Sequence, residues 1–218
     1  MEQVSSSVAS LVRPRLRGRL HQAAAVVSVA GLAWLIVDAH TPTALVAAWV
    51  YGLAMIALYA TSSTYHVYAR SERARRIMQR MDHSMIYVLI AGSYTPVCLL
   101  ALEGTLRWVA LGLVWGGALA GVLIAAFALD RFVRIRWGLY FALGWAALLA
   151  APALADRTDL IVFAALGGML YTVGAVLFAM ERPRPVAVWF GYHEVWHALG
   201  ILGGASIFAM NLGLIAAA

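Results

Sequence analysis

Two histidines with metal-chelating spacing lie near the C-terminus, where residues 192–197 read YHEVWH and contain the string HExxH. On a helix, residues four apart lie about 40° apart in projection and about 6 Å apart along the axis. His193 and His197 can therefore hold one ion between them. In soluble zinc proteases the glutamate of this string acts as general base. The string predicts a metal site and leaves the role of Glu194 open.

Further polar residues flank two earlier apolar runs, and they could supply the third ligand and the carboxylate that the histidine pair lacks. Three histidines and a water form the open coordination of a catalytic zinc, whose bound water is acidified toward about pH 7. His66 is the expected third ligand, and Asp82 is a carboxylate able to hold or deprotonate that water. Ser62 is four residues before His66, so it shares a helix face with this ligand and can hydrogen-bond beside it.

The remaining histidines have plainer interpretations. His21 and His40 are expected in the membrane interface, as isolated histidines at helix ends usually are. His83 follows Asp82 but lies about 100° round the helix, so it is expected to face a headgroup or a neighbouring helix. For Glu194 the alternative to a base is a rim carboxylate, favoured by the helix dipole and close to Arg182 or Arg184.

The composition places these residues in a membrane protein. Of 218 residues, 63% are hydrophobic and 12% are charged, and the mean hydropathy is +0.83. An ordinary soluble domain has roughly 25% charged residues. The net charge of +6 could suggest a nucleic-acid partner, but the arginines have a better use in setting topology, and we predict membrane lipids as the partner. The single cysteine, Cys98, excludes a disulfide framework and a cysteine-rich zinc cluster.

Seven runs are long and apolar enough to cross about 30 Å of hydrocarbon as helices. We predict an all-α bundle of seven transmembrane helices in one domain, residues 22–218, after a tail at residues 1–21. The predicted spans are 22–38, 44–67, 82–101, 106–128, 137–155, 159–180 and 192–215. This topology brings the end of the second span and the starts of the third and seventh spans to one membrane face.

The arginines predict the orientation, because positive residues in short loops stay cytoplasmic. Fourteen of the sixteen fall on one side, in the tail and in the second, fourth and sixth loops. Only Arg107 and Arg157 fall on the other. The N-terminus is therefore expected in the cytoplasm, the C-terminus outside it, and the metal site near the inner surface of the cell membrane.

Three separated segments resemble signatures of the hemolysin III family: SSTYH at 62–66, MDHSMIYVLIAGSYTP at 81–96 and FGYHEVWH at 190–197. This family is related to the adiponectin and progestin receptors and, more distantly, to alkaline ceramidases. The resemblance implies seven helices with the N-terminus inside and zinc bound by His66, His193 and His197. It further implies that Asp82 holds the zinc-bound water and that Ser62 matches the serine of the first signature.

The resemblance also exposes two differences. A glutamate between the paired histidines is not shared across the relatives, which weakens Glu194 as a base. Relatives often carry a histidine ten residues after the pair, where this chain has Ile207, so the same activity does not follow.

Three functions stay open at this point. The first is a zinc-dependent hydrolase of a lipid amide or ester, since relatives are linked to ceramide hydrolysis and membrane-lipid homeostasis. The second is a membrane sensor in which zinc is structural. The third is a cytolytic protein, which seven spans without a continuous polar stripe disfavour as a direct pore.

Overall fold

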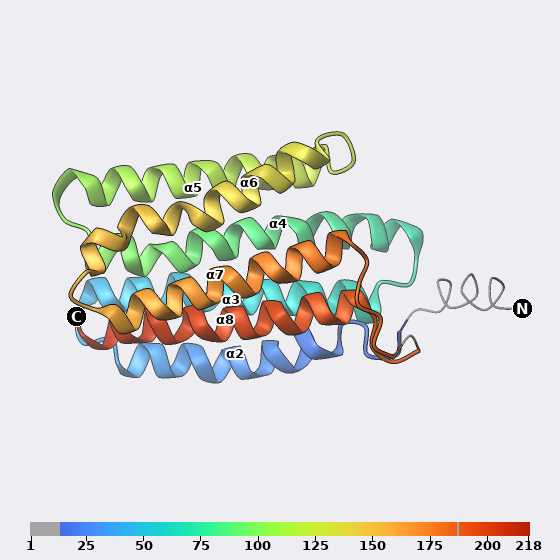
Figure 1. Cartoon of the computed structure of the whole chain (residues 1–218), viewed down its shortest axis with the longest axis horizontal. Coiled ribbons are helices and arrows are strands. Elements are labelled where there is room, and N and C mark those ends of the chain that lie inside the picture. The colour runs from blue at the N-terminus through green and yellow to red at the C-terminus, as the bar shows by residue number, and fades with distance from the viewer. Residues whose placement is uncertain (1–13, 187) are drawn as a thin grey trace, which may run out of the picture.

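Seven long helices run through residues 14–186 and 188–218, the part of the chain that the computed structural model describes (Figure 1). They are α2 (Arg19–Val37), α3 (Pro42–Tyr68), α4 (Glu72–Pro96), α5 (Gly104–Phe127), α6 (Val133–Trp145), α7 (Thr158–Ala179) and α8 (Tyr192–Ala216). A π-helical turn, Val97–Ala101, extends α4, and a 3-10 segment, Ala146–Leu154, extends α6. With these extensions all seven are long and apolar enough to span a membrane. The predicted all-α, seven-helix class is confirmed, and the chain is a multi-pass integral membrane protein.

The starts of α3 and α4, the helices that carry His66 and Asp82, are fixed by side-chain caps. Thr41 caps α3, because its hydroxyl accepts a hydrogen bond from the amide of Ala44, and Pro42 fills the first helical position. Ser71 caps α4 in the same way through the amide of Ala74. These caps satisfy amides that have no partner inside the helix.

The helix α4 is longer than the apolar run from which the third span was predicted. The predicted span begins at residue 82, whereas α4 begins at Glu72. Hydropathy detects only the part of a helix that lies in hydrocarbon, and the first turns of α4 are rich in exposed arginine. Asp82 and His83 consequently lie well inside α4 and do not open it.

The helices form two packed groups around the site. One buried apolar cluster joins α4, α5, α6 and α7 with the C-terminal half of α8, with Tyr87 and Val114 among its members. The other joins α2, α3 and α8, with Leu35 and Tyr51 among its members. Figure 1 shows α5 and α6 at one edge of the bundle and α2 at the other, with α3, α4, α7 and α8 between them. The second, third and seventh spans of the sequence, α3, α4 and α8, thus meet in the middle.

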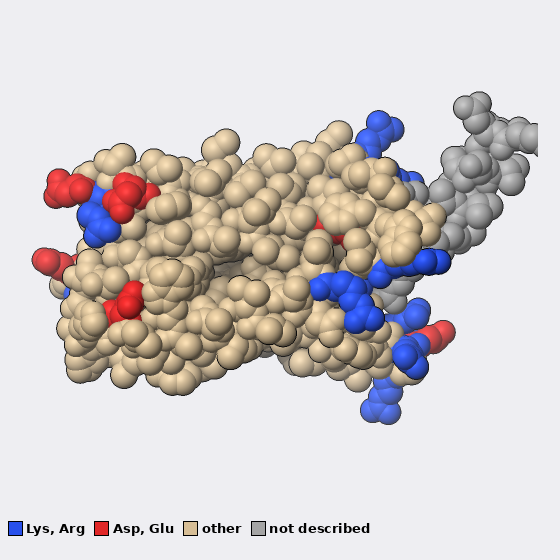
Figure 2. All heavy atoms as spheres, turned by 90° about the horizontal axis from the view of Figure 1, so that it is seen from below, with Lys and Arg blue, Asp and Glu red and all other residues tan. Residues whose placement is uncertain are grey.

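The charged side chains gather at the two ends of the bundle. On the face shown in Figure 2, most of the basic side chains lie at the end where α2 begins and the acidic ones lie mainly at the opposite end, with few charged residues between them. This distribution agrees with a membrane lying across the middle of the bundle.

A close approach of α3 and α4 yields a first prediction. A Cβ at Gly92 would lie 2.6 Å from Ala54 Cβ, and neither atom belongs to a flexible chain that could move aside. We expect Gly92→Ala to destabilise the protein by about 1–3 kcal/mol through overpacking, seen as a lower Tm in detergent. Gly112→Ala is the matched control, because a Cβ there meets nothing within 4 Å. An unchanged Tm for Gly92→Ala would contradict the packing of these helices.

Candidate metal centre

Three histidines from two helices converge at the arginine-rich end. His66 lies in the last turns of α3, while His193 and His197 lie in the first turns of α8. One ring nitrogen of each falls within 4.8 Å of the other two. The Nε2 atoms of His66 and His193 are 3.2 Å apart, close to the spacing of about 3.3 Å that two nitrogens have on a tetrahedral zinc. The predicted trio is therefore assembled, and it could hold a metal ion.

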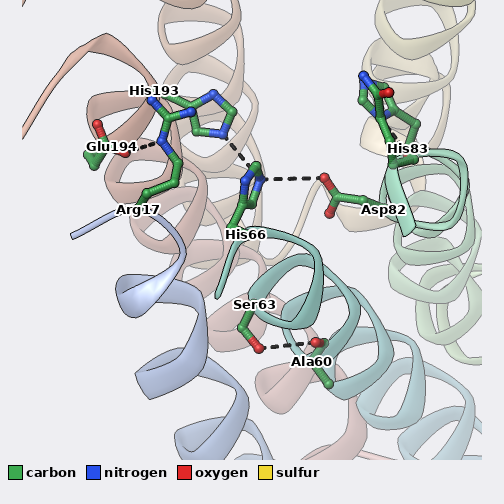
Figure 3. A network of polar contacts seen from close by, with 9 residues as sticks. Arg17, Ala60, Ser63, His66, Asp82, His83, His193 and Glu194 are labelled. Atoms are coloured by element: carbon green, nitrogen blue, oxygen red, sulfur yellow. Dashed lines mark hydrogen bonds and ion pairs between the residues drawn. The ribbon is translucent and has the colours of Figure 1, made fainter. Parts of the chain in front are cut away.

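Two further predicted residues lie beside the three histidines: Ser62, one turn before His66 on α3, and Asp82 on α4. Asp82 reaches from α4, and its Oδ2 lies 3.7 Å from His66 Nε2 (Figure 3). The buried Ser62 hydroxyl donates a hydrogen bond to the Asp82 carboxylate. The carboxylate is thus oriented by one partner and directed at the histidines, as a group that handles a metal-bound water must be.

Glu194 faces away from this cluster. Its side chain is 1% exposed and forms an ion pair with Arg17, which precedes α2. Its other oxygen accepts a hydrogen bond of 2.8 Å from the amide of Gly191, so Glu194 also caps α8. Figure 3 shows Glu194 directed toward Arg17 on the far side of His193 from Asp82. The expected partners Arg182 and Arg184 were wrong: the cation comes from the N-terminal segment.

The remaining histidines divide as follows. His83 donates through Nδ1 to the carbonyl of Gln79 at 2.8 Å and lies beyond Asp82 (Figure 3), so its predicted exclusion from the trio is confirmed. His40 is exposed, as expected. The interfacial position expected for His21 is wrong.

His21 is buried beside the trio, where its ring stacks on His197 with centroids 3.8 Å apart and planes 4° apart. This contact restricts the orientation of a ring in the candidate metal site. Hydropathy could not reveal it, because the first predicted span began at residue 22 and left His21 in the tail. Among the described residues its Nδ1 has no hydrogen-bond partner.

A cavity of about 650 Å³ adjoins the trio and is lined by α3, α4, α6, α7 and α8. Its lining is largely apolar and aromatic, with side chains such as Met55, Leu89, Phe141 and Ile207. The volume is within the range of about 300–1,000 Å³ typical of small-molecule sites. The position at which relatives often have a histidine therefore faces this cavity as an apolar side chain.

Arg136 is a further cavity residue that the sequence reading missed. Hydropathy assigned it to a loop as a topology signal, but it lies in α6 and is 8% exposed. Its guanidinium donates 2.7 Å to the carbonyl of Leu129, while its own carbonyl accepts from the hydroxyl of Tyr87 at 3.1 Å. Its aliphatic stem and tertiary contacts bury it, neither of which a charge count detects.

Similarity to known proteins agrees with this arrangement. The chain matches the family described as "Haemolysin-III related" over residues 9–208. It is 35% identical to Hemolysin-3 of Bacillus cereus over 192 residues, covering 86% of this chain and 84% of that protein. It is 32% identical to the Hemolysin-3 homolog of Bacillus subtilis, with 86% and 87% covered. Similarity extends to the human monocyte to macrophage differentiation factor, 26% identical over 160 residues, 70% of this chain and 63% of that protein. With three histidines gathered at one end of seven helices, and with matches over nearly its whole length, the chain belongs to the haemolysin-III-related family.

Proposed function

We propose that the protein is a zinc-dependent hydrolase that cleaves an amide or ester bond of a membrane lipid. The observation that carries the proposal is the junction of an open three-histidine site with a large apolar cavity. A metal-binding site alone would fit many roles, and an apolar cavity alone would fit any lipid-binding protein. Their contact at the level of Asp82 supports a reaction on a lipid whose polar group reaches the histidines.

Each group of the site has a role under this proposal. His66, His193 and His197 would hold zinc, which as a Lewis acid polarises a carbonyl and acidifies water. Asp82 would orient the attacking water and accept its proton at the carboxylate, and Ser62 would hold Asp82 in place. The apolar walls would bind the acyl chain and exclude bulk water, which strengthens the electrostatic interactions inside.

A sparsely packed seam of the bundle offers a route for the lipid. α6 and α7 make few contacts with each other, although both contribute walls to the cavity, through Phe141 and Phe178 for example. Trp145 bridges this seam by donating 3.1 Å to the hydroxyl of Thr172. We propose that the lipid moves in laterally between α6 and α7.

A second candidate function has its own supporting observation. α3 and α8 touch sparsely in comparison with α2 and α3 or with α7 and α8, yet both contribute histidines to the trio. An ion shared by His66 and His193 would clamp these helices together, as a structural zinc in a membrane sensor would. The two candidates differ in what Asp82 must do: it handles a proton in the hydrolase and only packs beside the ion in the sensor.

The orientation in the membrane is part of the proposal. We propose that the arginine-rich end, and with it the metal centre, faces the cytoplasm. In intact cells Glu103→Cys should be labelled by a membrane-impermeant maleimide, whereas Arg73→Cys should be labelled only after the cells are opened; both positions are exposed. The native Cys98 is buried and gives little background. Labelling of Arg73→Cys in intact cells would reverse the orientation.

A further inference from the structure

The segment before α2 lies over the metal centre on its arginine-rich side. We name Pro14–Gly18 the N-terminal strap. Its backbone pairs with the loop that leads into α8: the amide of Arg15 donates 3.0 Å to the carbonyl of Val188, and the amide of Leu16 donates 3.3 Å to that of Trp189. The guanidinium of Arg15 also lies over the Trp189 ring, 4.7 Å from its centroid. Residues far apart in the sequence are thereby joined beside the trio.

One buried ion pair fastens the strap to α8. The Arg17 side chain is 21% exposed, and its partner Glu194 is 1% exposed. Because Glu194 lies between the ligands His193 and His197 in sequence, the strap is attached to the same helical turn that presents the metal-binding rings. A buried carboxylate that loses its cation is strongly destabilised, so the strap and the first turn of α8 hold each other in place.

The strap also touches the third ligand. Gly18 has a φ of +79° and packs against α3, where a Cβ in its place would lie 2.5 Å from His66 Cβ. Only glycine tolerates both this left-handed conformation and this contact. The strap therefore contacts both helices that carry the histidines, and Arg17 itself lines the cavity at the trio.

We propose that the N-terminal strap is a lid over the metal centre, locked by the Arg17–Glu194 pair, and that its opening sets the rate at which the ion exchanges with the aqueous phase. This inference rests on the proposed binding of zinc by the trio. It assigns the glutamate of the HExxH string to the retention of the metal: Glu194 is a positioning residue, acting through the strap and the α8 cap.

The test measures the release of zinc from the purified, zinc-loaded full chain in detergent after addition of excess chelator. We expect Arg17→Gln and Glu194→Gln to release zinc on the order of tenfold faster than the wild type, since both leave one partner of a buried pair uncompensated. Arg19→Gln is the matched control, because among the described residues the Arg19 side chain bonds only to the side chain of Gln22; this variant should release zinc at the wild-type rate. The exchanged pair Arg17→Glu with Glu194→Arg should recover at least part of the slow release that either single charge reversal loses.

A second readout needs no metal. Because the Arg17 side chain is paired with Glu194 in the closed strap, we expect trypsin to cut after Arg17 when the strap is detached. Glu194→Gln, which keeps every arginine, should therefore be cut there faster than the wild type. Equal cutting in the two proteins, or equal zinc release from the wild type and Arg17→Gln, would overturn the lid. A wild type that binds no zinc would instead overturn the proposed function, and the trypsin comparison would then decide the lid alone.

Discussion

Purified wild-type protein is expected to retain one zinc ion per chain, and purified His66→Ala protein is expected to lose it. The substitution leaves two imidazoles on one helix, and no other described histidine, cysteine or acidic residue joins a cluster of three around an ion. Loss of an outer-shell partner already lowers metal affinity by about 10- to 100-fold, and the loss of a ligand should exceed this. The measurement is the zinc content per chain after dialysis against metal-free buffer. His66 is the informative position because it lies on a different helix from the HExxH string.

Two histidine variants control for this result. His40→Ala changes an exposed residue and should keep one zinc per chain. His83→Ala changes a residue that bonds to Gln79 and lies away from the trio, so it should keep the ion too. Full zinc occupancy in His66→Ala would show that the histidine pair of α8 binds the ion without α3, and the site as described would fail.

The same variant tests how the bundle is held together. Since α3 and α8 touch sparsely, the ion would supply a large part of their mutual attachment. We expect wild-type protein stripped of zinc to unfold at a lower temperature, and His66→Ala to match it with or without added zinc. Stabilisation of the variant by zinc would point to a second metal site.

The number and type of the helices could be predicted from sequence because lipid leaves few alternatives. An apolar run of about 20 residues must be helical, and loop charge orders the runs across the membrane. The trio followed from the same logic. Helices that alternate in direction bring His66 of α3 and His193 of α8 to one end, and the spacing of the α8 pair already fits one ion.

The errors have a common physical origin, which is tertiary contact between segments that hydropathy treats as independent. His21 was assigned to the interface because nothing in a lone histidine indicates that it will stack on His197. Glu194 was paired with nearby arginines, whereas its partner Arg17 is 177 residues away. Arg136 was counted as a loop charge although its side chain is buried in the bundle. In each of these cases the predicted helix start lies within a few residues of the observed one, but the contact that the side chain makes in the folded bundle is not visible in its own segment.

Asp82→Asn is expected to keep the metal and the fold while losing turnover. The amide has nearly the shape of the carboxylate and can still accept a hydrogen bond from Ser62, so its position near His66 should persist. What it lacks is the ability to accept a proton from water. Loss of a positioned general base lowers rates by about 10²–10⁴-fold, and we expect a loss of that size in the release of fatty acid from vesicles containing ceramides and other acyl lipids, measured by mass spectrometry.

The Asp82→Asn variant distinguishes the two candidate functions because Asp82 has a different role in each. If zinc only clamps α3 to α8, then Asp82→Asn should behave like the wild type in zinc content, Tm and cellular phenotype, whereas His193→Ala should lower the Tm strongly. If zinc acts in hydrolysis, Asp82→Asn should retain zinc and Tm yet lose fatty-acid release and phenotype together. Asp130→Asn, an exposed loop carboxylate, controls for the change of charge. The hydrolase would be excluded if the wild type binds zinc but leaves every acyl lipid intact and Asp82→Asn is indistinguishable from it. The clamp would then remain, and the Asp82 carboxylate, 3.7 Å from His66 Nε2, would serve packing alone.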